Sequence, residues 1–214
     1  MKILSHRGHW KSLEEKNTRS AFERSFKLGY GTETDLRDHN GEIVISHDIP
    51  IGDKMTFVEL LNIANQFSSV EAPLTLALNV KADGLQDKIA SLMSGYRNIS
   101  YFLFDMSVPD MRLYLEKKLP LYTRYSEIEK NPVYFEESKG VWLDNFSKDI
   151  WYSEKDLTSL LSKRNVCIVS SELHNNDPFP LWTMLNYHKR HDNLFLCTDR
   201  PEEAFEFFER KSNE

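Results

Sequence analysis

The chain alternates between short strand-like runs and helical segments along its whole length. This alternation is typical of a parallel sheet covered by helices, because parallel strands need a long crossover connection between them. Eight strand–helix pairs follow one another without a linker-like gap, which favours a closed (βα)8 barrel, the TIM-barrel architecture, over an open sheet. The 214 residues are fewer than the roughly 250 typical of such barrels. We therefore expect one compact domain, residues 1–214, with short loops.

The expected elements follow from hydrophobic periodicity and from turn residues. The eight strands are expected at 2–5, 31–37, 74–81, 100–107, 120–125, 140–146, 166–174 and 193–200. The helices are expected at 17–29, 57–67, 83–96, 108–118, 153–165, 180–191 and 201–211, with a weaker helical stretch through Tyr134 and Phe135. The run 42–48 is expected to pair back on the second strand after a turn at 38–41.

Composition excludes several classes of protein. The formal net charge is −6 and there is no basic run, so a nucleic-acid partner is not expected. No apolar stretch reaches the ~20 residues that span a bilayer, so stable membrane insertion is not expected. The N-terminus lacks the pattern of a signal peptide, and Cys167 and Cys197 lie in apolar runs typical of buried thiols. These features together predict a cytoplasmic protein.

Glu33 and Asp35 lie two residues apart on the second expected strand, so their side chains point to the same face. Two carboxylates about 5 Å apart repel by roughly 3 kcal/mol at an effective dielectric near 20. A hard divalent cation such as Mg²⁺ or Ca²⁺ would turn this repulsion into attraction, since both prefer oxygen ligands. Taken alone, such a pair is more often a solvated pair of surface charges.

The third expected strand adds polar groups near this pair. Its apolar residues alternate with Asn79 and Lys81, which share the opposite face of the strand. At the end of a barrel strand these two side chains would lie beside Glu33 and Asp35. An amide oxygen can bind a metal and an ammonium can hold a phosphate oxygen. If this strand is considered alone, a purely structural role, in which its polar side chains are hydrogen-bonded inside the barrel, is as good an interpretation as ligand binding.

Two histidines complete the candidate site. His6 ends the first expected strand and His47 ends the run that pairs back on the second. Imidazoles titrate near neutrality, so one can withdraw a proton while the other supplies one. The planar guanidinium group of Arg7 can donate paired hydrogen bonds to phosphate oxygens, and Gly8 allows the loop to approach a ligand. The remaining histidines receive no role, and the pair His188 and His191 is interpreted as part of a solvated helix face.

Several short motifs, in this order and at these spacings, resemble the glycerophosphodiester phosphodiesterase family. They are His6-Arg7-Gly8, Asn17-Thr18, Ala21-Phe22, Glu33-Thr34-Asp35, Val44-Ile45-Ser46-His47-Asp48, Phe104-Asp105 and Thr198-Asp199-Arg200-Pro201. The resemblance spans nearly the whole chain, but its chemical part lies within residues 6–81.

The resemblance implies a TIM barrel that cleaves a small-molecule phosphodiester of the glycerol type into an alcohol and a glycerol phosphate, with a divalent cation. It implies that His6 and His47 act as acid and base and that Glu33 and Asp35 bind the metal. It further implies that Lys81 supports the phosphate and that the substrate's own hydroxyl is the first nucleophile.

The sequence departs from the family pattern at three places. Asn79 stands where the third metal ligand is usually a glutamate, so we expect weaker cation binding. Glu15 is separated from Asn17 by one inserted residue, and it is a candidate replacement for the missing acid. Glu172 stands near a family motif that is absent here, and we expect it either to restore a charge at the barrel mouth or to bind a substrate hydroxyl.

Two alternatives to a glycerophosphodiester hydrolase remain. A barrel that binds phosphodiesters without turning them over, as a sensor or accessory protein, is favoured by Asn79 and disfavoured by the pair His6 and His47. A lipid-directed phosphodiesterase would need an exposed apolar or basic docking loop, and the sequence has no clear one.

Overall fold

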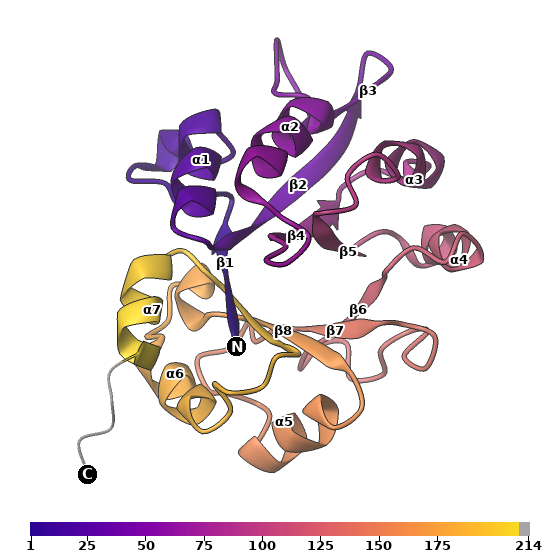
Figure 1. Ribbon diagram of the computed structural model, residues 1–214. Coiled ribbons are helices and arrows are strands. Elements are labelled where there is room, and N and C mark those ends of the chain that lie inside the picture. Colours follow the sequence, from indigo (N-terminus) through magenta and orange to yellow (C-terminus); the bar gives the residue numbers. More distant parts are fainter. Residues whose placement is uncertain (210–214) are drawn as a thin grey trace.

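The computed structural model describes residues 1–209, which form a nearly closed barrel of eight parallel strands with helices outside it (Figure 1). The strands are β1 (Lys2–His6), β2 (Gly31–His39), β3 (Glu42–Ile45), β4 (Thr75–Val80), β5 (Ser100–Phe104), β6 (Tyr122–Tyr125), β7 (Gly140–Leu143), β8 (Asn165–Val169) and β9 (Leu194–Thr198). The helices are α1 (Arg19–Lys27), α2 (Phe57–Phe67), α3 (Gln86–Met93), α4 (Val108–Glu116), α5 (Glu154–Leu161), α6 (Phe179–Asn186) and α7 (Pro201–Glu209).

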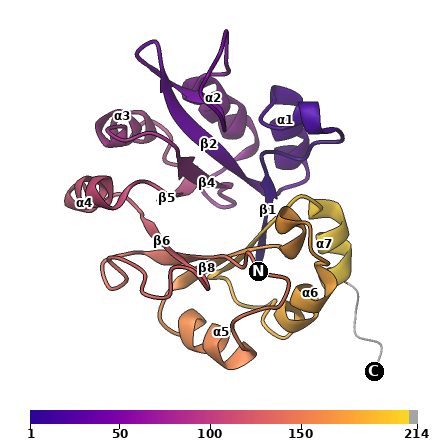
Figure 2. The same cartoon turned by 180° about the vertical axis from the view of Figure 1, so that it is seen from behind.

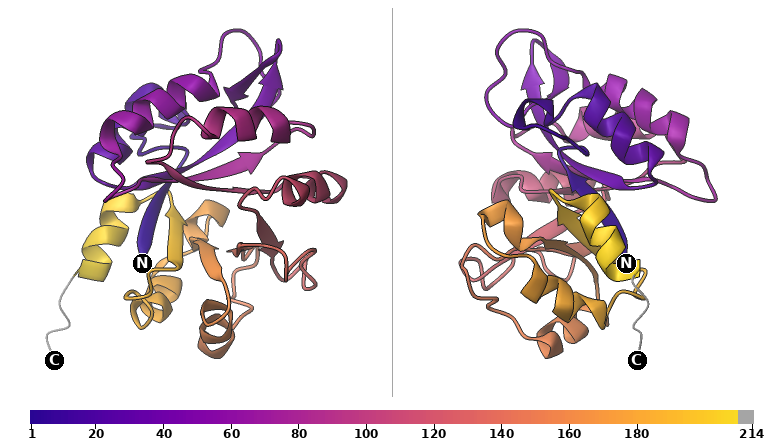
Figure 3. Two further views of the ribbon diagram at one scale, coloured as in Figure 1. Left: turned by 45° about the vertical axis from the view of Figure 1, so that its right-hand side comes forward. Right: turned by 90° about the vertical axis from the view of Figure 1, so that its left-hand side faces the viewer.

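The strand order is β5-β4-β2-β1-β9-β8-β7-β6, and the ninth strand, β3, pairs antiparallel with the outer part of β2. The ring closes between β5 and β6 through one parallel bridge, Leu103 with Leu121. Figure 2 shows the helices outside the strands from the other side of the barrel, and both views of Figure 3 show α7 beside β1. The predicted barrel is therefore confirmed.

Local sequence accounts for several boundaries. Thr56 caps α2 and exchanges hydrogen bonds with Glu59, as a hydroxyl before an amphipathic run predicts. Asn40 and Gly41, with φ of 49° and 78°, form the turn that brings β3 back on β2. The predicted pairing of the run 42–48 is thus confirmed for its strand residues.

The predicted helix through Tyr134 and Phe135 is wrong. The chain between β6 and β7 forms turns, and α5 comes only after β7, so seven α-helices lie within residues 1–209. Pro132 has no N–H to give to a helix, and Tyr134 takes a left-handed φ of 53°. The last predicted helix extends to residue 211, and its final two residues lie outside the described part of the chain.

The barrel interior is filled by aromatic and small apolar side chains. Phe102 stacks on Tyr122 and Phe104 on Trp142, each pair with ring centroids 3.8 Å apart. Cys167 and Cys197 are free thiols buried in the same layer, as predicted. This packing closes the barrel interior, so polar groups can gather only at the ends of the strands.

In the described part of the chain, no helix is long and apolar enough to cross a membrane.

The outward faces of the strands carry the second apolar layer, under the helices. Leu76, Leu78 and Val80 of β4 lie in the cluster formed with α1, α2 and α3, whereas Ala77 faces the barrel interior. The expected division of this strand into a helix-facing and an inward-facing side is therefore correct.

Truncation of Leu78 tests this layer. We expect Leu78→Ala to lower the free energy of unfolding by about 2–5 kcal/mol, because it leaves a cavity at a fully buried site. Ile128→Ala is the control, since that side chain is 73% exposed and surface truncation changes stability by less than about 0.5 kcal/mol. Denaturant titration measures both, and equal effects would contradict the assigned packing.

Candidate functional site

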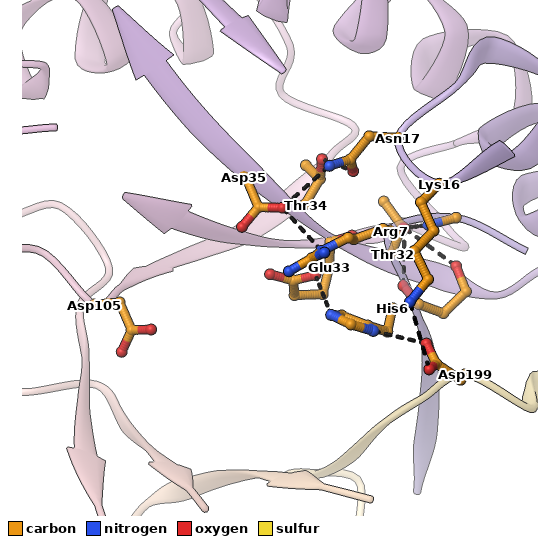
Figure 4. Close-up of polar contacts among 12 residues, drawn as sticks. His6, Arg7, Lys16, Asn17, Thr32, Glu33, Thr34, Asp35, Asp105 and Asp199 are labelled. Atoms are coloured by element: carbon orange, nitrogen blue, oxygen red, sulfur yellow. Dashed lines mark hydrogen bonds and ion pairs between the residues drawn. The ribbon is translucent and has the colours of Figure 1, made fainter. Parts of the chain in front are cut away.

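Polar side chains gather where the parallel strands end at the carboxyl rim of the barrel. The register pairs His6 with Glu33 across β1 and β2, and Asp35 with Asn79 across β2 and β4. Because laterally paired residues point to the same face of a sheet, all four side chains project into the opening. Figure 4 shows the cluster around Glu33 and Asp35 and, apart from it, Asp105 from the end of β5.

The carboxylate of Asp35 is fully buried and has several polar neighbours. Oδ2 lies 3.1 Å from Arg7 Nε and accepts a hydrogen bond of 3.1 Å from Asn17 Nδ2. Oδ1 lies 3.8 Å from Lys81 Nζ. Asn17 is held in turn, because Thr34 Oγ1 donates to its side-chain oxygen at 2.8 Å. The cationic side chains directly after β1 and β4 thus compensate the negative charge that Asp35 of β2 brings into the barrel.

Glu33 is buried beside Asp35 with less compensation. Burial raises the pKa of Glu33 well above its usual value, and the charge of Asp35 raises it further, while Arg7 and Lys81 act in the opposite direction. Its Oε2 lies 3.8 Å from His6 Nε2. The site therefore holds a carboxyl group whose ionised form is costly without an additional positive charge.

His6 is oriented by a second carboxylate. Its Nδ1 lies 2.7 Å from Asp199 Oδ1, at the end of β9, and Lys16 Nζ lies 3.8 Å from the other oxygen of Asp199. Burial lowers the pKa of His6, and the hydrogen bond to Asp199 opposes this effect. The ring therefore keeps one nitrogen against Asp199 and presents Nε2 toward Glu33, an arrangement suited to proton transfer.

Glu172 has partners other than the predicted ones. It lies on a 3₁₀ turn, η2 (Ser171–His174), where it accepts hydrogen bonds from the hydroxyls of Ser170 and Thr198 and, at 3.1 Å, from the backbone N–H of Asp199. Its carboxylate thus holds the chain segment that carries Asp199. The predicted contact with substrate stays a prediction.

His47 lies at the same rim but outside the buried cluster. Its side chain is 45% exposed, and Nδ1 lies 2.8 Å from Asp48, whose side chain is 92% exposed. The backbone ties it to the site, because the N–H of Ser46 donates to the carbonyl of Asp35 at 3.1 Å. The structure thus brings six predicted residues together, namely His6, Arg7, Glu33, Asp35, Asn79 and Lys81, and leaves His47 at their edge.

One expectation about the first loop, that for Glu15, needs correction, whereas the predicted approach of Gly8 to a ligand stays a prediction. Glu15 does not replace a missing acid in the cluster, because it pairs with Arg24 at 2.9 Å and accepts from the N–H of Lys11 at 2.8 Å. Gly8, with φ of 83°, is required by close approach to α1, since a Cβ there would lie 2.7 Å from Cβ of Ala21.

One observation indicates that this cluster is suited to bind a divalent cation. Three buried oxygens, Glu33 Oε2, Asp35 Oδ1 and Asn79 Oδ1, have no hydrogen-bond partner within the described residues. One free oxygen from each of two carboxylates, together with an amide oxygen, suits a hard cation. No group of three His, Cys, Asp or Glu side chains in residues 1–209 is arranged to hold a metal. The third oxygen would therefore come from the amide of Asn79.

A second polar network occupies the other side of the opening. Arg124 of β6 donates to both oxygens of Asp105, the Nε contact being 2.8 Å, and Nη1 donates to Asp144 at 2.8 Å. His174 Nε2 lies 2.7 Å from the same Asp144. This network joins β5 to β6 and β7 at the point where the barrel closes through a single bridge.

Sequence reasoning assigned no chemical role to Asn17, Asp144, His174 or Asp199. Asn17 and Asp199 lie in the motifs that carry the family resemblance, so a signal for them was present. Asp144 lies near the end of the strand predicted at 140–146 and directly follows the observed β7, the place where catalytic residues of barrels lie. The contact of His174 with Asp144 joins residues 30 positions apart and has no signature in the sequence.

Comparisons with known proteins support the fold. No protein-family model matches the chain, and no curated protein matches its sequence. Among solved structures, a glycerophosphodiester phosphodiesterase from Agrobacterium tumefaciens is similar with a TM-score of 0.65, at 14% identity over 97% of this chain and 98% of that one.

Two further structures share the fold. A Ca²⁺-dependent phosphatidylinositol-specific phospholipase C from Streptomyces antibioticus has a TM-score of 0.60 at 10% identity, covering 97% of this chain and 95% of that one. A dihydropteroate synthase from Anaplasma phagocytophilum has a TM-score of 0.53 at 10% identity, covering 97% and 96%. The chain thus has the fold of these proteins, which include two phosphodiesterases.

Removing the charge of Glu33 tests the electrostatics of the cluster. A carboxyl group whose pKa is raised by folding contributes stability at low pH, and this contribution is lost as the pH rises through the folded-state pKa. We therefore expect cation-free Glu33→Gln to unfold at a higher temperature than the unaltered protein at pH 8, with the difference shrinking toward pH 4. Calorimetry measures both midpoints, and a lower midpoint for the variant at pH 8 would contradict the assignment.

Proposed function

We propose that this protein hydrolyses a glycerol-type phosphodiester to an alcohol and a phosphomonoester at the rim formed by β1, β2 and β4. The proposal rests mainly on one observation, the combination of a partly buried His6–Asp199 pair with the carboxylates of Glu33 and Asp35 in one cluster. The first arrangement suits proton transfer and the second suits a cation. The family resemblance and the two phosphodiesterases that share the fold support the same reaction class.

The phosphate would be held by the two basic side chains beside Asp35. Within residues 1–209, Nη1 and Nη2 of Arg7 make no hydrogen bond, and Lys81 Nζ has only the 3.8 Å contact with Asp35. Their remaining donors are therefore free for phosphate oxygens.

Three oxygens, those of Glu33, Asp35 and Asn79, would hold Mg²⁺ or Ca²⁺. When bound, such a cation offsets charge on the phosphoryl oxygens and acidifies a hydroxyl bound to it. The orphaned buried oxygens support this ligand set.

In this mechanism His6 removes the proton from the attacking hydroxyl through Nε2, while Asp199 holds the ring in place and stabilises its positive charge. A hydroxyl of the substrate is the first nucleophile, which gives a cyclic phosphate that water then opens. A second imidazole at the rim protonates the departing alcohol, and the resemblance implies His47 for this role.

One observation favours a second candidate, a barrel that binds phosphodiesters without turnover. Asn79 brings a neutral oxygen where a third carboxylate would bind a cation more strongly. An assay with glycerol phosphodiesters that differ in their alcohol, with and without chelator, separates the two. Product release that chelator stops supports the hydrolase, whereas binding without product supports the second candidate.

Replacement of His6 tests the proposed base. We expect His6→Ala to lower kcat by about 100-fold or more, the usual contribution of general acid–base catalysis, with little change in the far-ultraviolet circular dichroism. The replacement His191→Ala, at an exposed imidazole far along the chain, is the control. A rate for His6→Ala within a few-fold of the control would refute the assignment.

Restoring an acid at position 79 tests the cation site. We expect Asn79→Glu to tighten Mg²⁺ or Ca²⁺ binding, because an anionic oxygen replaces a neutral one beside Glu33 and Asp35. Isothermal titration calorimetry with the metal alone measures this directly. Unchanged affinity would mean that residue 79 is not a ligand.

A further inference from the structure

A second His–Asp pair lies at the barrel rim, between β7 and η2. His174 Nε2 lies 2.7 Å from Asp144 Oδ1, and the Asp144 side chain is buried. The pair repeats the arrangement of His6 and Asp199, whose contact is also 2.7 Å. In both, one ring nitrogen is held by a carboxylate at the end of a barrel strand.

The orientation of His174 is fixed from several sides. Asp144 Oδ1 also accepts from the N–H of Asn145 at 2.9 Å, and Oδ2 accepts from Arg124 at 2.8 Å, so the carboxylate cannot turn away. The ring of Phe146 lies 4.8 Å from that of His174, centroid to centroid. A ring held in this way presents its other nitrogen in one direction.

The other nitrogen, Nδ1, makes no hydrogen bond within residues 1–209, and the His174 side chain is 24% exposed. A fixed imidazole with one free nitrogen and partial access to solvent is what a proton carrier requires. A purely structural histidine in the same place would tie η2 to β7 and do nothing with Nδ1.

Both His–Asp pairs share one stretch of the rim. Glu172, two residues before His174 on η2, accepts from the N–H of Asp199, the partner of His6. The strands involved, β7, β8, β9 and β1, are consecutive in the barrel. One short turn therefore connects the pair that holds His6 with the pair that holds His174.

His47 is held less firmly. Its partner Asp48 is almost fully exposed, and an exposed ion pair of adjacent residues orients a ring weakly. We infer that His174, rather than His47, supplies the proton to the departing alcohol; this inference rests on the proposed phosphodiester hydrolysis.

The bond between phosphorus and the alcohol oxygen breaks, its electron pair goes to that oxygen, and the proton on Nδ1 of the His174 imidazolium passes to it. Neutral imidazole remains, with Nε2–H donating to Asp144. When water opens the cyclic phosphate, Nδ1 takes the proton of the water, which restores the starting state.

Leaving-group dependence distinguishes this role from a structural one. Two glycerol phosphodiesters are compared, one with ethanol and one with p-nitrophenol as the departing alcohol, since p-nitrophenolate leaves without taking up a proton. The variant is His174→Gln, whose amide nitrogen can keep the contact that Nε2 makes with Asp144. His47→Asn, which can likewise keep the contact of Nδ1 with Asp48, is the matched variant, and His191→Gln is the control.

We expect His174→Gln to lower the single-turnover rate of alcohol release from the ethyl ester by about 100-fold or more, while the p-nitrophenyl ester keeps most of its rate of alcohol release, because this step precedes the opening of the cyclic phosphate. We expect His47→Asn to affect alcohol release from both esters alike. Equal losses on both esters in His174→Gln with an unchanged thermal midpoint, or no loss, would overturn the inference. If His174→Gln lowers the thermal midpoint, the rates of alcohol release from the two esters are compared in His174→Asn instead. Equal losses on both esters in that variant would overturn the inference.

The outcomes also separate this inference from the proposed function. A selective loss in His47→Asn instead would identify His47 as the donor and leave the hydrolase intact. Absence of turnover of either ester by the unaltered protein would overturn the proposed function itself, together with the role of His174.

Discussion

Two carboxylates of one strand, buried side by side in the mouth of a barrel, determine how the rest of the rim is built. Glu33 and Asp35 point inward from β2, and their mutual repulsion in a partly dry environment must be offset. Arg7, Lys81 and Asn17 offset it for Asp35. The offset for Glu33 is incomplete, and this deficit is the physical basis for placing a cation there.

The carboxylates can be held in this way because the barrel beneath them is solid. Stacked aromatic rings fill its interior, so the strand ends keep fixed positions and their side chains keep fixed separations. The seam between β5 and β6 is the weakest part of the wall, with a single bridge, and the ion pairs of Arg124 reinforce it from the rim. The proposed site and the closure of the barrel thus depend on neighbouring polar networks.

The sequence predicted those features that depend on local pattern. Alternation predicted the barrel, and the two-residue period of β4 correctly placed Asn79 on the inward face, opposite Asp35. The helix expected near Tyr134 was wrong, because a left-handed residue after a proline outweighed its apolar spacing. The hydrogen bonds of Glu172 and the pair of His174 with Asp144 depend on segments that meet only in the folded chain, so no periodicity could have revealed them.

The most direct test of the account is a crystal structure of the protein with Mg²⁺ or Ca²⁺ and glycerol phosphate. We expect a cation bound by oxygens of Glu33, Asp35 and Asn79, with phosphate oxygens on Arg7 and Lys81 and within reach of His6. A cation bound elsewhere, with the oxygens of Glu33 and Asp35 left without a ligand, would contradict it.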